Sequence, residues 1–233
     1  MKLKKPGKIL VFSLGGSLVV PNKGINISFL NELRKGLFSI LALDFIEKII
    51  LVVGGGKTSR DYIKASKDLS GVSQKDLDNL GIISTQLNAE LVKLFLGSRV
   101  YGEVLQNPEN LPNKGEIIIA SGWKPGNSTD LNTVLWALKA KQKIVYNLTD
   151  VDRVYKKDPH KFPNAKAFEK LSWPAFKDII GGSWEPGLST PFGPIACKKA
   201  EEHNMKVVVL KGNDFENIKK CIQAKECIAT IIG

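Results

Sequence analysis

The chain has 233 residues, of which 43% are hydrophobic and 24% charged, the composition of an ordinary soluble globular protein. That composition excludes a collagen, a disordered tail and a small disulfide-stabilised protein. The formal net charge of +11, from 34 basic and 23 acidic residues, favours anionic ligands without deciding among nucleotides, phosphates and nucleic acid.

Short apolar runs rich in Ile and Val alternate with longer amphipathic segments along the whole chain. This alternation predicts an α/β fold, in which a mostly parallel sheet is covered by helices on both faces. The predicted strands are residues 9–14, 48–53, 99–103, 116–120, 143–148, 206–210 and 227–232. The predicted helices are residues 28–43, 58–69, 75–96, 128–140, 194–203 and 215–224.

The sequence carries no signal for a membrane or for export. Its longest apolar runs, such as residues 49–53, fall far short of the ~20 residues that a membrane-spanning helix needs. The basic residues 1–8 precede an apolar run, residues 9–14, that is too short for the core of a secretion signal. We therefore expect a cytoplasmic protein with no membrane partner.

The chain has three cysteines, Cys197, Cys221 and Cys227. No two of them form a C-x-x-C motif, and each has apolar residues near it in the sequence. We expect reduced structural thiols and no metal site.

Basic residues are scattered, apart from a cluster at Lys2, Lys4, Lys5 and Lys8. They are not interleaved with aromatic residues, and no nucleic-acid-binding motif is present, so a solvated basic surface is the favoured interpretation. Nucleic-acid binding remains an alternative, and it predicts an affinity that falls steeply with salt.

Glycine-containing loops follow three predicted strands, at residues 15–17, 54–58 and 122–130. Functional loops of such sheets lie at the carboxyl ends of the strands. Glycine lets backbone N–H groups approach a phosphate, and the helix that follows adds positive partial charge at its N-terminus. Each loop alone is better explained as a tight strand-to-helix turn, because an isolated glycine signal is weak. Three such loops together favour a ligand with several phosphates, such as a donor and an acceptor held in line.

Two common phosphate-binding motifs are absent. Gly56-Lys57-Thr58 resembles the end of a P-loop, but that motif requires a glycine five residues before Gly56, where this chain has Leu51. The G-x-G-x-x-G spacing of dinucleotide-binding folds is also missing. The loops therefore do not indicate a Walker A ATPase.

Several segments, in matching order, resemble motifs of the amino-acid kinase superfamily and, within it, of the archaeal-type uridylate (UMP) kinases. VVGGGKTSRDYI at residues 52–63 resembles VVGGGK-x-x-R-x-YI, and residues 77–82 with 85–89 resemble D-x-x-G-I and T-R-x-N-A. KPGNSTD at residues 124–130 is similar to PG-x-[ST]-T-D, and residues 149–159 are similar to TNVDGVY-x-x-DP. The resemblance extends from residue 9 to about residue 210, and the D-x-x-G-I and T-x-x-N-A pair favours uridylate kinases over amino-acid and carbamate kinases.

The resemblance implies a three-layer αβα sandwich with a mostly parallel central sheet of about eight strands. Residues 1–233 would form a single domain, in which a lobe of about residues 1–145 holds UMP and a lobe of about residues 146–233 holds ATP. The implied activity is the ATP-dependent phosphorylation of UMP to UDP in pyrimidine nucleotide biosynthesis, with Mg²⁺ carried by ATP. Family members form hexamers, so a homohexamer is implied as well.

The resemblance also assigns roles to individual residues. The implied substrate-binding residues are Gly54, Gly55, Asp78, Gly122, Lys124, Gly126, Ser128 and Thr129. The implied ATP-binding residues are Gly16, Ser17, Gly56, Arg60, Thr149, Asp150, Tyr155 and Asp158. The implied catalytic residues are Gly15, Gly16, Lys57 and Asp130.

Within these sets, backbone N–H groups of Gly54 and Gly55 and the hydroxyls of Ser128 and Thr129 would donate to the UMP phosphate. Asp78 would accept hydrogen bonds from the ribose hydroxyls.

The chain departs from the family pattern at the first glycine loop. Many superfamily members have a lysine two residues before the first glycine, where this chain has Ser13. Another cation would then have to replace that lysine, and Lys57 and Lys198 are the candidates.

Further departures concern the region implied to bind ATP. Gly193 replaces an aspartate of the family, and Arg153 replaces a glycine. Trp123 and Trp184 are unusual bulky residues that we expect to serve in packing, with stacking against a nucleobase as the alternative.

Two alternatives to a uridylate kinase stay open. The first is another kinase of the superfamily, acting on a small acid or phosphate such as acetylglutamate or isopentenyl phosphate. The second is a catalytically impaired nucleotide-binding regulatory protein. Asp78 argues against the first alternative because those substrates have no ribose. Ser13 and Gly193 motivate the second.

Overall fold

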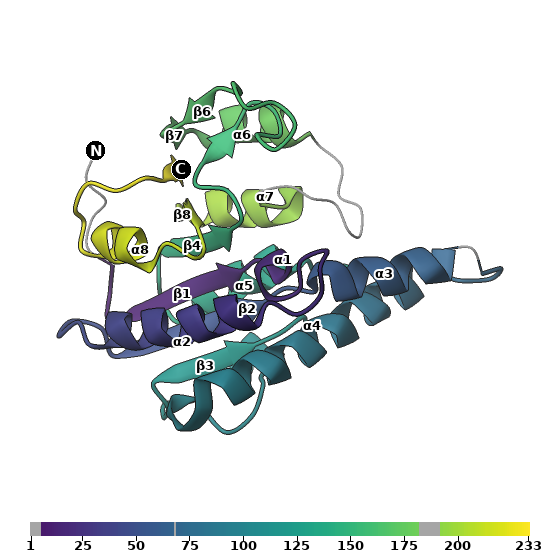
Figure 1. The fold of residues 1–233 in the computed structure, drawn as a ribbon, viewed down its shortest axis with the longest axis horizontal. Helices are drawn as coiled ribbons and strands as arrows, with labels where there is room; N and C mark the ends of the chain where they lie inside the picture. The colour runs from purple at the N-terminus through teal and green to yellow at the C-terminus, as the bar shows by residue number, and fades with distance from the viewer. Residues whose placement is uncertain (1–5, 68, 182–191) are drawn as a thin grey trace.

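A sheet of seven strands, in the order β3-β2-β1-β4-β8-β9-β7, forms the centre of the computed structural model, which describes residues 6–67, 69–181 and 192–233 (Figure 1). Neighbouring strands are parallel except β8 and β9. The strands are β1 (Ile9–Leu14), β2 (Lys48–Val53), β3 (Ile117–Ala120), β4 (Ile144–Thr149), β7 (Lys170–Leu171), β8 (Lys206–Lys211) and β9 (Thr230–Ile232). A separate antiparallel hairpin is formed by β5 (Val154–Tyr155) and β6 (Ala167–Phe168).

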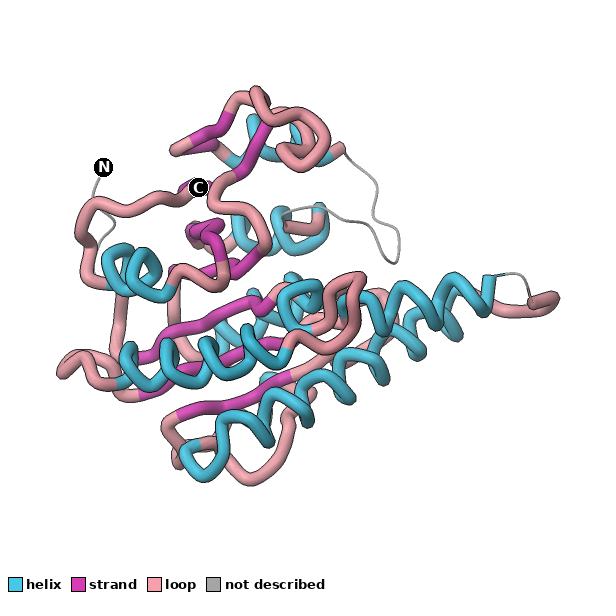
Figure 2. Tube along the Cα trace, in the orientation of Figure 1, coloured by secondary structure: helices cyan, strands magenta, loops and turns pink. Residues whose placement is uncertain are grey.

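Helices cover both faces of this sheet (Figures 1 and 2). They are α1 (Gly16–Val19), α2 (Ile27–Leu41), α3 (Gly56–Lys67), α4 (Gln74–Leu96), α5 (Thr129–Lys139), α6 (Trp173–Ile180), α7 (Pro194–Glu202) and α8 (Phe215–Ile222), with 3₁₀ turns at Gly97–Arg99 and Pro108–Asn110. Most longer helices begin at a polar residue whose side chain accepts a hydrogen bond from a backbone N–H of the first turn. These residues are Asn26, Ser73, Ser128, Ser172 and Asp214.

Alternating side chains of each strand point to opposite faces, and this divides the apolar core into two clusters. In β1, Leu10 and Phe12 are buried against α2, α4 and α8, whereas Val11 is buried against α5, α6 and α7. Both faces are therefore apolar, as expected for a parallel sheet between two helix layers.

Helices α3 and α4 lie side by side and project beyond the carboxyl ends of the parallel strands (Figures 1 and 2). Only the amino-terminal part of α4 extends in this way, since its carboxyl-terminal part packs on β2 and β3. The long helix thus connects the sheet with the loops at the carboxyl ends of the strands.

The predicted α/β fold with a mostly parallel sheet is confirmed, with seven strands where the resemblance implied about eight. The predicted strand at residues 99–103 is wrong. Val100 and Leu105 form only isolated bridges to β3, because Gly97, with a φ of 72°, ends α4 and a 3₁₀ turn follows. Helix α6 was not predicted, although Ser172 and the proline within its first turn are typical helix-start signals.

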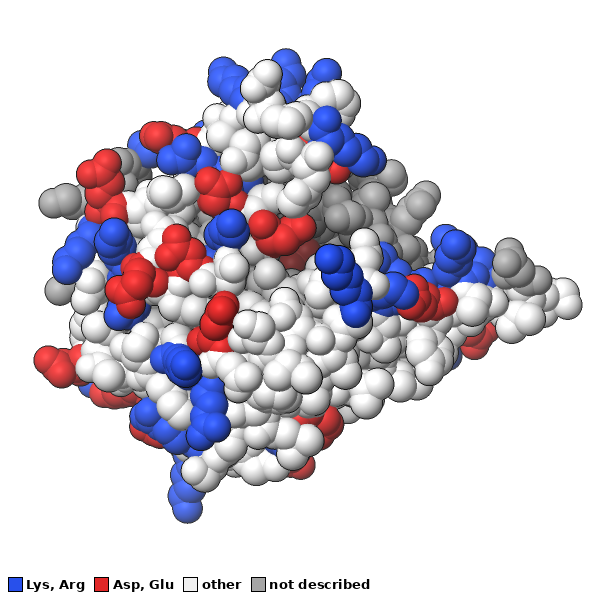
Figure 3. All heavy atoms as spheres, in the orientation of Figure 1, with Lys and Arg blue, Asp and Glu red and all other residues white. Residues whose placement is uncertain are grey.

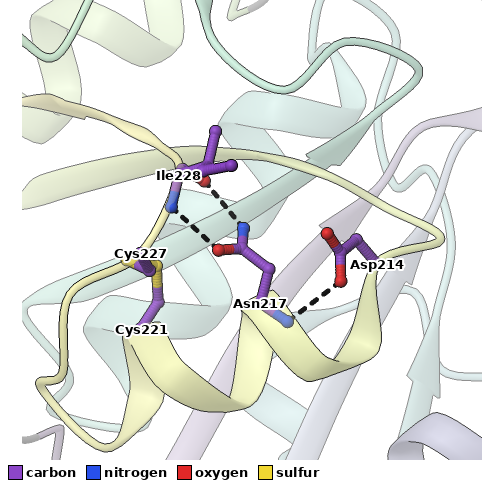
Figure 4. Close-up of a disulfide and its surroundings, with 5 residues drawn as sticks. All are labelled: Asp214, Asn217, Cys221, Cys227 and Ile228. Carbon is purple, nitrogen blue, oxygen red and sulfur yellow. Dashed lines mark hydrogen bonds between the residues drawn. A yellow bond between two sulfur atoms is a disulfide. The ribbon is translucent and has the colours of Figure 1, made fainter.

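The prediction of reduced cysteines is wrong for one pair. Cys221 at the end of α8 and Cys227 in the following loop form a disulfide, with their Cα atoms 5.4 Å apart (Figure 4). The side chain of Asn217 brings them together, because it bonds both the N–H and the C=O of Ile228 at 2.8 Å. Cys197 remains a free thiol, and burial raises its pKa to about 12.

Basic and acidic side chains are interspersed on the face shown in Figure 3, with basic side chains over the region of β6 at its top. None of the described helices is both long and apolar enough to cross a bilayer. The basic residues Lys2, Lys4 and Lys5, and also Trp184, lie outside the described residues.

Candidate functional site

The three glycine loops meet at one cavity of about 280 Å³ at the carboxyl ends of the parallel strands. Ligands of open α/β sheets bind at this edge. The cavity brings together most of the predicted residues: Gly15, Gly16, Ser17, Gly54, Gly55, Gly56, Arg60, Asp78, Gly122, Lys124, Ser128, Thr129, Asp130 and Thr149. The remaining ones, Lys57, Gly126, Asp150, Tyr155 and Asp158, do not line it.

The first two loops are in backbone contact. A Cβ atom on Gly16 would lie 2.1 Å from the nitrogen of Gly56, and one on Gly56 would lie 2.3 Å from the oxygen of Gly16. Gly56 also has a φ of +59°. Since real Cβ contacts are never so short, this approach requires glycine at both positions.

The first glycine of each of these two loops is already hydrogen-bonded. The N–H of Gly15 donates to the carbonyl of Leu148, and that of Gly54 donates to the carbonyl of Leu14, each at 2.9 Å. These bonds tie both loops to the sheet. The prediction that the N–H of Gly54 donates to a phosphate is therefore corrected, because this group is engaged within the protein.

The free donors are the next amides along each loop. The N–H groups of Gly16, Gly55 and Gly56 have no hydrogen-bond partner among the residues that the structure describes. Gly16 begins α1 and Gly56 begins α3, so their N–H groups stand at helix N-termini. Unpaired N–H groups on a shared cavity make a binding place for an anion.

The third loop, residues 122–130, closes the cavity from the side of α5. Ser128 caps α5 by accepting a bond from the N–H of Leu131 at 3.1 Å, which leaves its hydroxyl hydrogen free to donate. The ammonium of Lys124 lies 3.9 Å from the ring centroid of Trp123. Trp123 thus makes a cation–π contact on the loop.

Asp78 of α4 connects this helix with the third loop. One carboxylate oxygen accepts the N–H of Gly126 at 2.6 Å, and the other accepts the side-chain amide of Gln74 at 3.0 Å. A carboxylate oxygen can accept two hydrogen bonds, so Asp78, which lines the cavity, retains acceptor capacity toward it.

Asp130, in the first turn of α5, lies deep in the cavity. Ser13 donates to one of its oxygens at 3.2 Å, and the N–H of Gly193 donates to the other at 3.0 Å. Burial raises the pKa of Asp130 to about 6, against the lowering effect of these two bonds. No cationic side chain of the described residues forms an ion pair with this carboxylate.

Arg60 and Lys124 are the cationic side chains among the residues that line the cavity. The guanidinium of Arg60 donates to the hydroxyl of Ser17 at 3.2 Å and to the side-chain oxygen of Asn22 at 3.5 Å, which holds it near the first loop. Lys57 pairs with Asp61 instead, on the helix surface. Lys198 is exposed on α7 and does not line the cavity.

The residues implied to surround the base and ribose of ATP form a separate group near the β5–β6 hairpin. Tyr155 donates to Asp152 at 2.7 Å, and this bond raises the pKa of the phenol. Asp150 lies 3.2 Å from the ring of His160. Asp158 accepts the backbone N–H of His160 at 2.9 Å. Thr149, at the end of β4, is the member of this group that reaches the cavity.

Thr85 and Asn88 of α4 hold the loops, and the sequence assigned them no role. Thr85 accepts the N–H of Gly122 at 2.7 Å, and Asn88 donates to the carbonyls of Gly54 and Gly55. Their spacing from Asp78 places all three on one face of the helix, which is the signal that could have identified them.

Among the described residues, no group of three or more His, Cys, Asp or Glu side chains is arranged to hold a metal ion. A nucleotide-borne divalent cation needs only one or two carboxylates from the protein. The unpaired carboxylate of Asp130 fits such a cation.

Comparisons with known proteins identify related sequences and a related fold. Residues 8–211 match the model of the amino acid kinase family. The chain is 35% identical over 219 residues to a uridylate kinase of Methanocaldococcus jannaschii, covering 91% of this chain and 96% of that protein. It is 32% identical over 231 residues to a uridylate kinase of Methanoculleus marisnigri, covering 97% and 95%. The crystal structure of a uridylate kinase from Archaeoglobus fulgidus is similar, with a TM-score of 0.78, 29% identity, and coverage of 97% of this chain and 100% of that one.

Proposed function

Because the chain belongs to the amino acid kinase family, we propose that it is an enzyme that transfers a phosphoryl group from ATP to UMP, with UDP as the product. The relatives named uridylate kinase support this activity. The observation that carries it is the cavity in which the unpaired N–H groups of Gly16, Gly55 and Gly56 meet the third glycine loop.

In this proposal the UMP phosphate lies between the second and third loops. The N–H of Gly55 and the hydroxyls of Ser128 and Thr129 donate to it, and Asp78 accepts from the ribose hydroxyls. All four residues line the cavity. Donors that surround an anion in a partly enclosed cavity bind it more strongly than water-exposed donors do.

Phosphoryl transfer requires mainly alignment and the neutralisation of charge on the phosphoryl oxygens. The N–H groups of Gly16 and Gly56 lie where the first two loops meet and donate to the group in transfer. Arg60 adds a guanidinium to the same cavity, in the place of the family lysine that Ser13 replaces. No general base is needed, because the phosphate of UMP is already ionised at neutral pH.

Mg²⁺ bound to ATP would supply further positive charge along the phosphates. Asp130 is the carboxylate that would face this cation, and Ser13 and Gly193 hold its two oxygens in place. Its role is to orient cationic groups.

ATP would occupy the lobe of about residues 146–233, and UMP the lobe of about residues 1–145. Thr149 lies at the border of the cavity, whereas Asp150, Tyr155 and Asp158 lie farther along the chain, near the β5–β6 hairpin. The base and ribose of ATP would therefore extend from the cavity toward this hairpin.

This activity would serve pyrimidine nucleotide biosynthesis in the cytoplasm. The active enzyme would be a homo-oligomer, and the family resemblance implies a hexamer. The exposed side chains of Ile83, Leu87 and Leu94, each more than half accessible, follow one side of α4 and support an interface with a second copy.

ADP release from ATP and Mg²⁺, measured against UMP, CMP, AMP, GMP, acetylglutamate and isopentenyl phosphate, tests the proposal. Turnover with UMP and little with the others is the expected result. Turnover with acetylglutamate or isopentenyl phosphate instead would identify a different kinase of the family. UMP binding without turnover of any acceptor would identify a nucleotide-binding regulatory protein.

A further inference from the structure

Asn88 of α4 is buried behind the second glycine loop, with 2% of its surface exposed. Its amide nitrogen donates to the carbonyls of Gly54 and Gly55, each at 2.9 Å. Asn88 itself does not line the cavity. The side chain therefore contacts the loop from the side opposite to the place of a ligand.

The bond to Gly54 sets the direction of the amide that follows it, whereas the carbonyl of Gly55 also accepts the backbone N–H of Ser59 at 3.2 Å, so Asn88 shares that role with α3. In a planar trans peptide the C=O and the next N–H point in opposite directions. Because the carbonyls of Gly54 and Gly55 are turned toward α4, the N–H groups of Gly55 and Gly56 are turned away from it. Both of these N–H groups are without a partner among the described residues, and both residues line the cavity.

Asparagine suits this position because its amide nitrogen carries two hydrogens, one for each carbonyl. Glycine peptides rotate more freely than others, so without Asn88 the peptide between Gly54 and Gly55 would sample orientations in which its carbonyl faces the anion. A carbonyl oxygen turned toward a phosphate repels it. The loop has no other side chain that bonds these two carbonyls among the described residues.

We infer that Asn88 is a positioning residue that turns the N–H of Gly55 toward the phosphate of the acceptor nucleotide and helps to turn that of Gly56 toward the group in transfer. The inference rests on the proposed function, since it assigns the anion to a nucleoside monophosphate. It predicts that Asn88 contributes to binding of the phosphate and not to binding of the nucleoside.

The test compares the binding of UMP with that of uridine, measured by calorimetry for UMP and by ligand-observed NMR for uridine. The variant Asn88→Asp keeps the size of the side chain but removes both donated hydrogen bonds. We expect its dissociation constant for UMP to rise about 10- to 100-fold, as for a lost hydrogen bond to a charged group, while that for uridine changes less than about threefold.

Asn217→Asp is the matched control. Asn217 is also buried, at 7% exposed, and donates to the carbonyl of Ile228 (Figure 4). Neither residue lines the cavity. We expect this variant to lose stability without any selective loss of UMP affinity. A selective loss of equal size in Asn217→Asp would overturn the inference, because the effect would then follow from general destabilisation.

Asn88→Ser is measured beside it, because the carboxylate of Asn88→Asp would also repel the phosphate by its charge, whereas a hydroxyl adds no charge and donates one bond in place of two. A selective loss of UMP affinity that is confined to Asn88→Asp overturns the inference. Equal weakening of UMP and uridine, or no weakening of UMP, overturns the inference in either variant. A wild-type protein that binds UMP no more tightly than uridine overturns it as well. A wild-type protein that prefers UMP but forms no UDP contradicts the proposed function, whereas a selective loss in the Asn88 variant would still support the positioning role.

Discussion

The carboxylate of Asp78 accepts the backbone N–H of Gly126 at 2.6 Å, and so joins the long helix α4 to the loop that follows β3. The residue thus has a structural contact in addition to its proposed contact with ribose. The contact with Gly126 and the proposed contact with ribose both help to position the acceptor nucleotide. Only the contact with ribose changes when the substrate lacks a ribose hydroxyl.

Replacing Asp78 by alanine is expected to raise the KM for UMP about 10-fold or more, with little change in the KM for ATP, because hydrogen bonds to a charged group are lost. Comparison with deoxyuridine 5′-monophosphate, which lacks one ribose hydroxyl, separates the two contacts. If Asp78 binds ribose, the wild-type preference for UMP over the deoxynucleotide disappears in Asp78→Ala. A preference that survives the substitution would leave Asp78 with the loop contact alone.

The contact of the first two glycine loops predicts that Gly16→Ala is severely destabilising. A Cβ on Gly16 would meet backbone atoms, which have no room to move, so we expect a loss of about 3 kcal/mol in the free energy of unfolding and a loss of activity. Gly102→Ala is the control, since no atom of residues 6–67, 69–181 and 192–233, apart from Gly102 and its two chain neighbours, lies within 4 Å of its Cβ position. Thermal and denaturant unfolding of both variants checks this expectation, and equal stability of the two would contradict it.

Asp130 predicts a pH-dependent effect on stability. Burial raises its pKa from a usual value near 3.8 to about 6 in the folded protein. As the pH rises, Asp130 therefore loses its proton at a lower pH in the unfolded chain than in the folded protein. The wild-type protein therefore loses stability from this group between about pH 4 and pH 6, whereas Asp130→Asn does not.

The stability of Asp130→Asn should accordingly exceed that of the wild type above pH 6, by up to about 3 kcal/mol, and approach it near pH 4. Denaturant unfolding across this pH range measures the difference. The same variant should turn over more slowly despite its greater stability, because the charge that orients cations is gone. A difference in stability that does not change with pH would show that Asp130 does not titrate in this range.

The two candidate cations are distinguished by a pair of substitutions. Arg60 lines the cavity, so Arg60→Ala should lower kcat/KM on the order of 100-fold. Lys57 pairs with Asp61 outside the cavity, so Lys57→Ala should lower it less than about threefold. Steady-state kinetics with ATP and UMP at constant ionic strength provide the comparison. A larger loss of kcat/KM in Lys57→Ala than in Arg60→Ala would identify Lys57, and not Arg60, as the catalytic cation.

The local pattern of the sequence predicted most strands and helices along the chain and the positions of the three loops. Apolar runs such as Lys48–Val53 are buried on both faces of the sheet, and such runs have no other stable place in a chain of this size. The glycines at residues 15–16 and 54–56, directly after two apolar runs, indicated the first two loops in the same way. These features depend on residue type and spacing, which the sequence contains.

Tertiary structure alone decided which groups of the loops are free to act. Gly54 and Gly55 are adjacent and alike in sequence, yet the N–H of Gly54 bonds to Leu14 while that of Gly55 has no partner in the part of the chain that the structure describes. Asn88 and Cys227 likewise acquire their contacts from residues that lie far along the chain or across a loop. Hydrogen-bond partners depend on the directions of groups after packing, and no spacing of residue types specifies those directions.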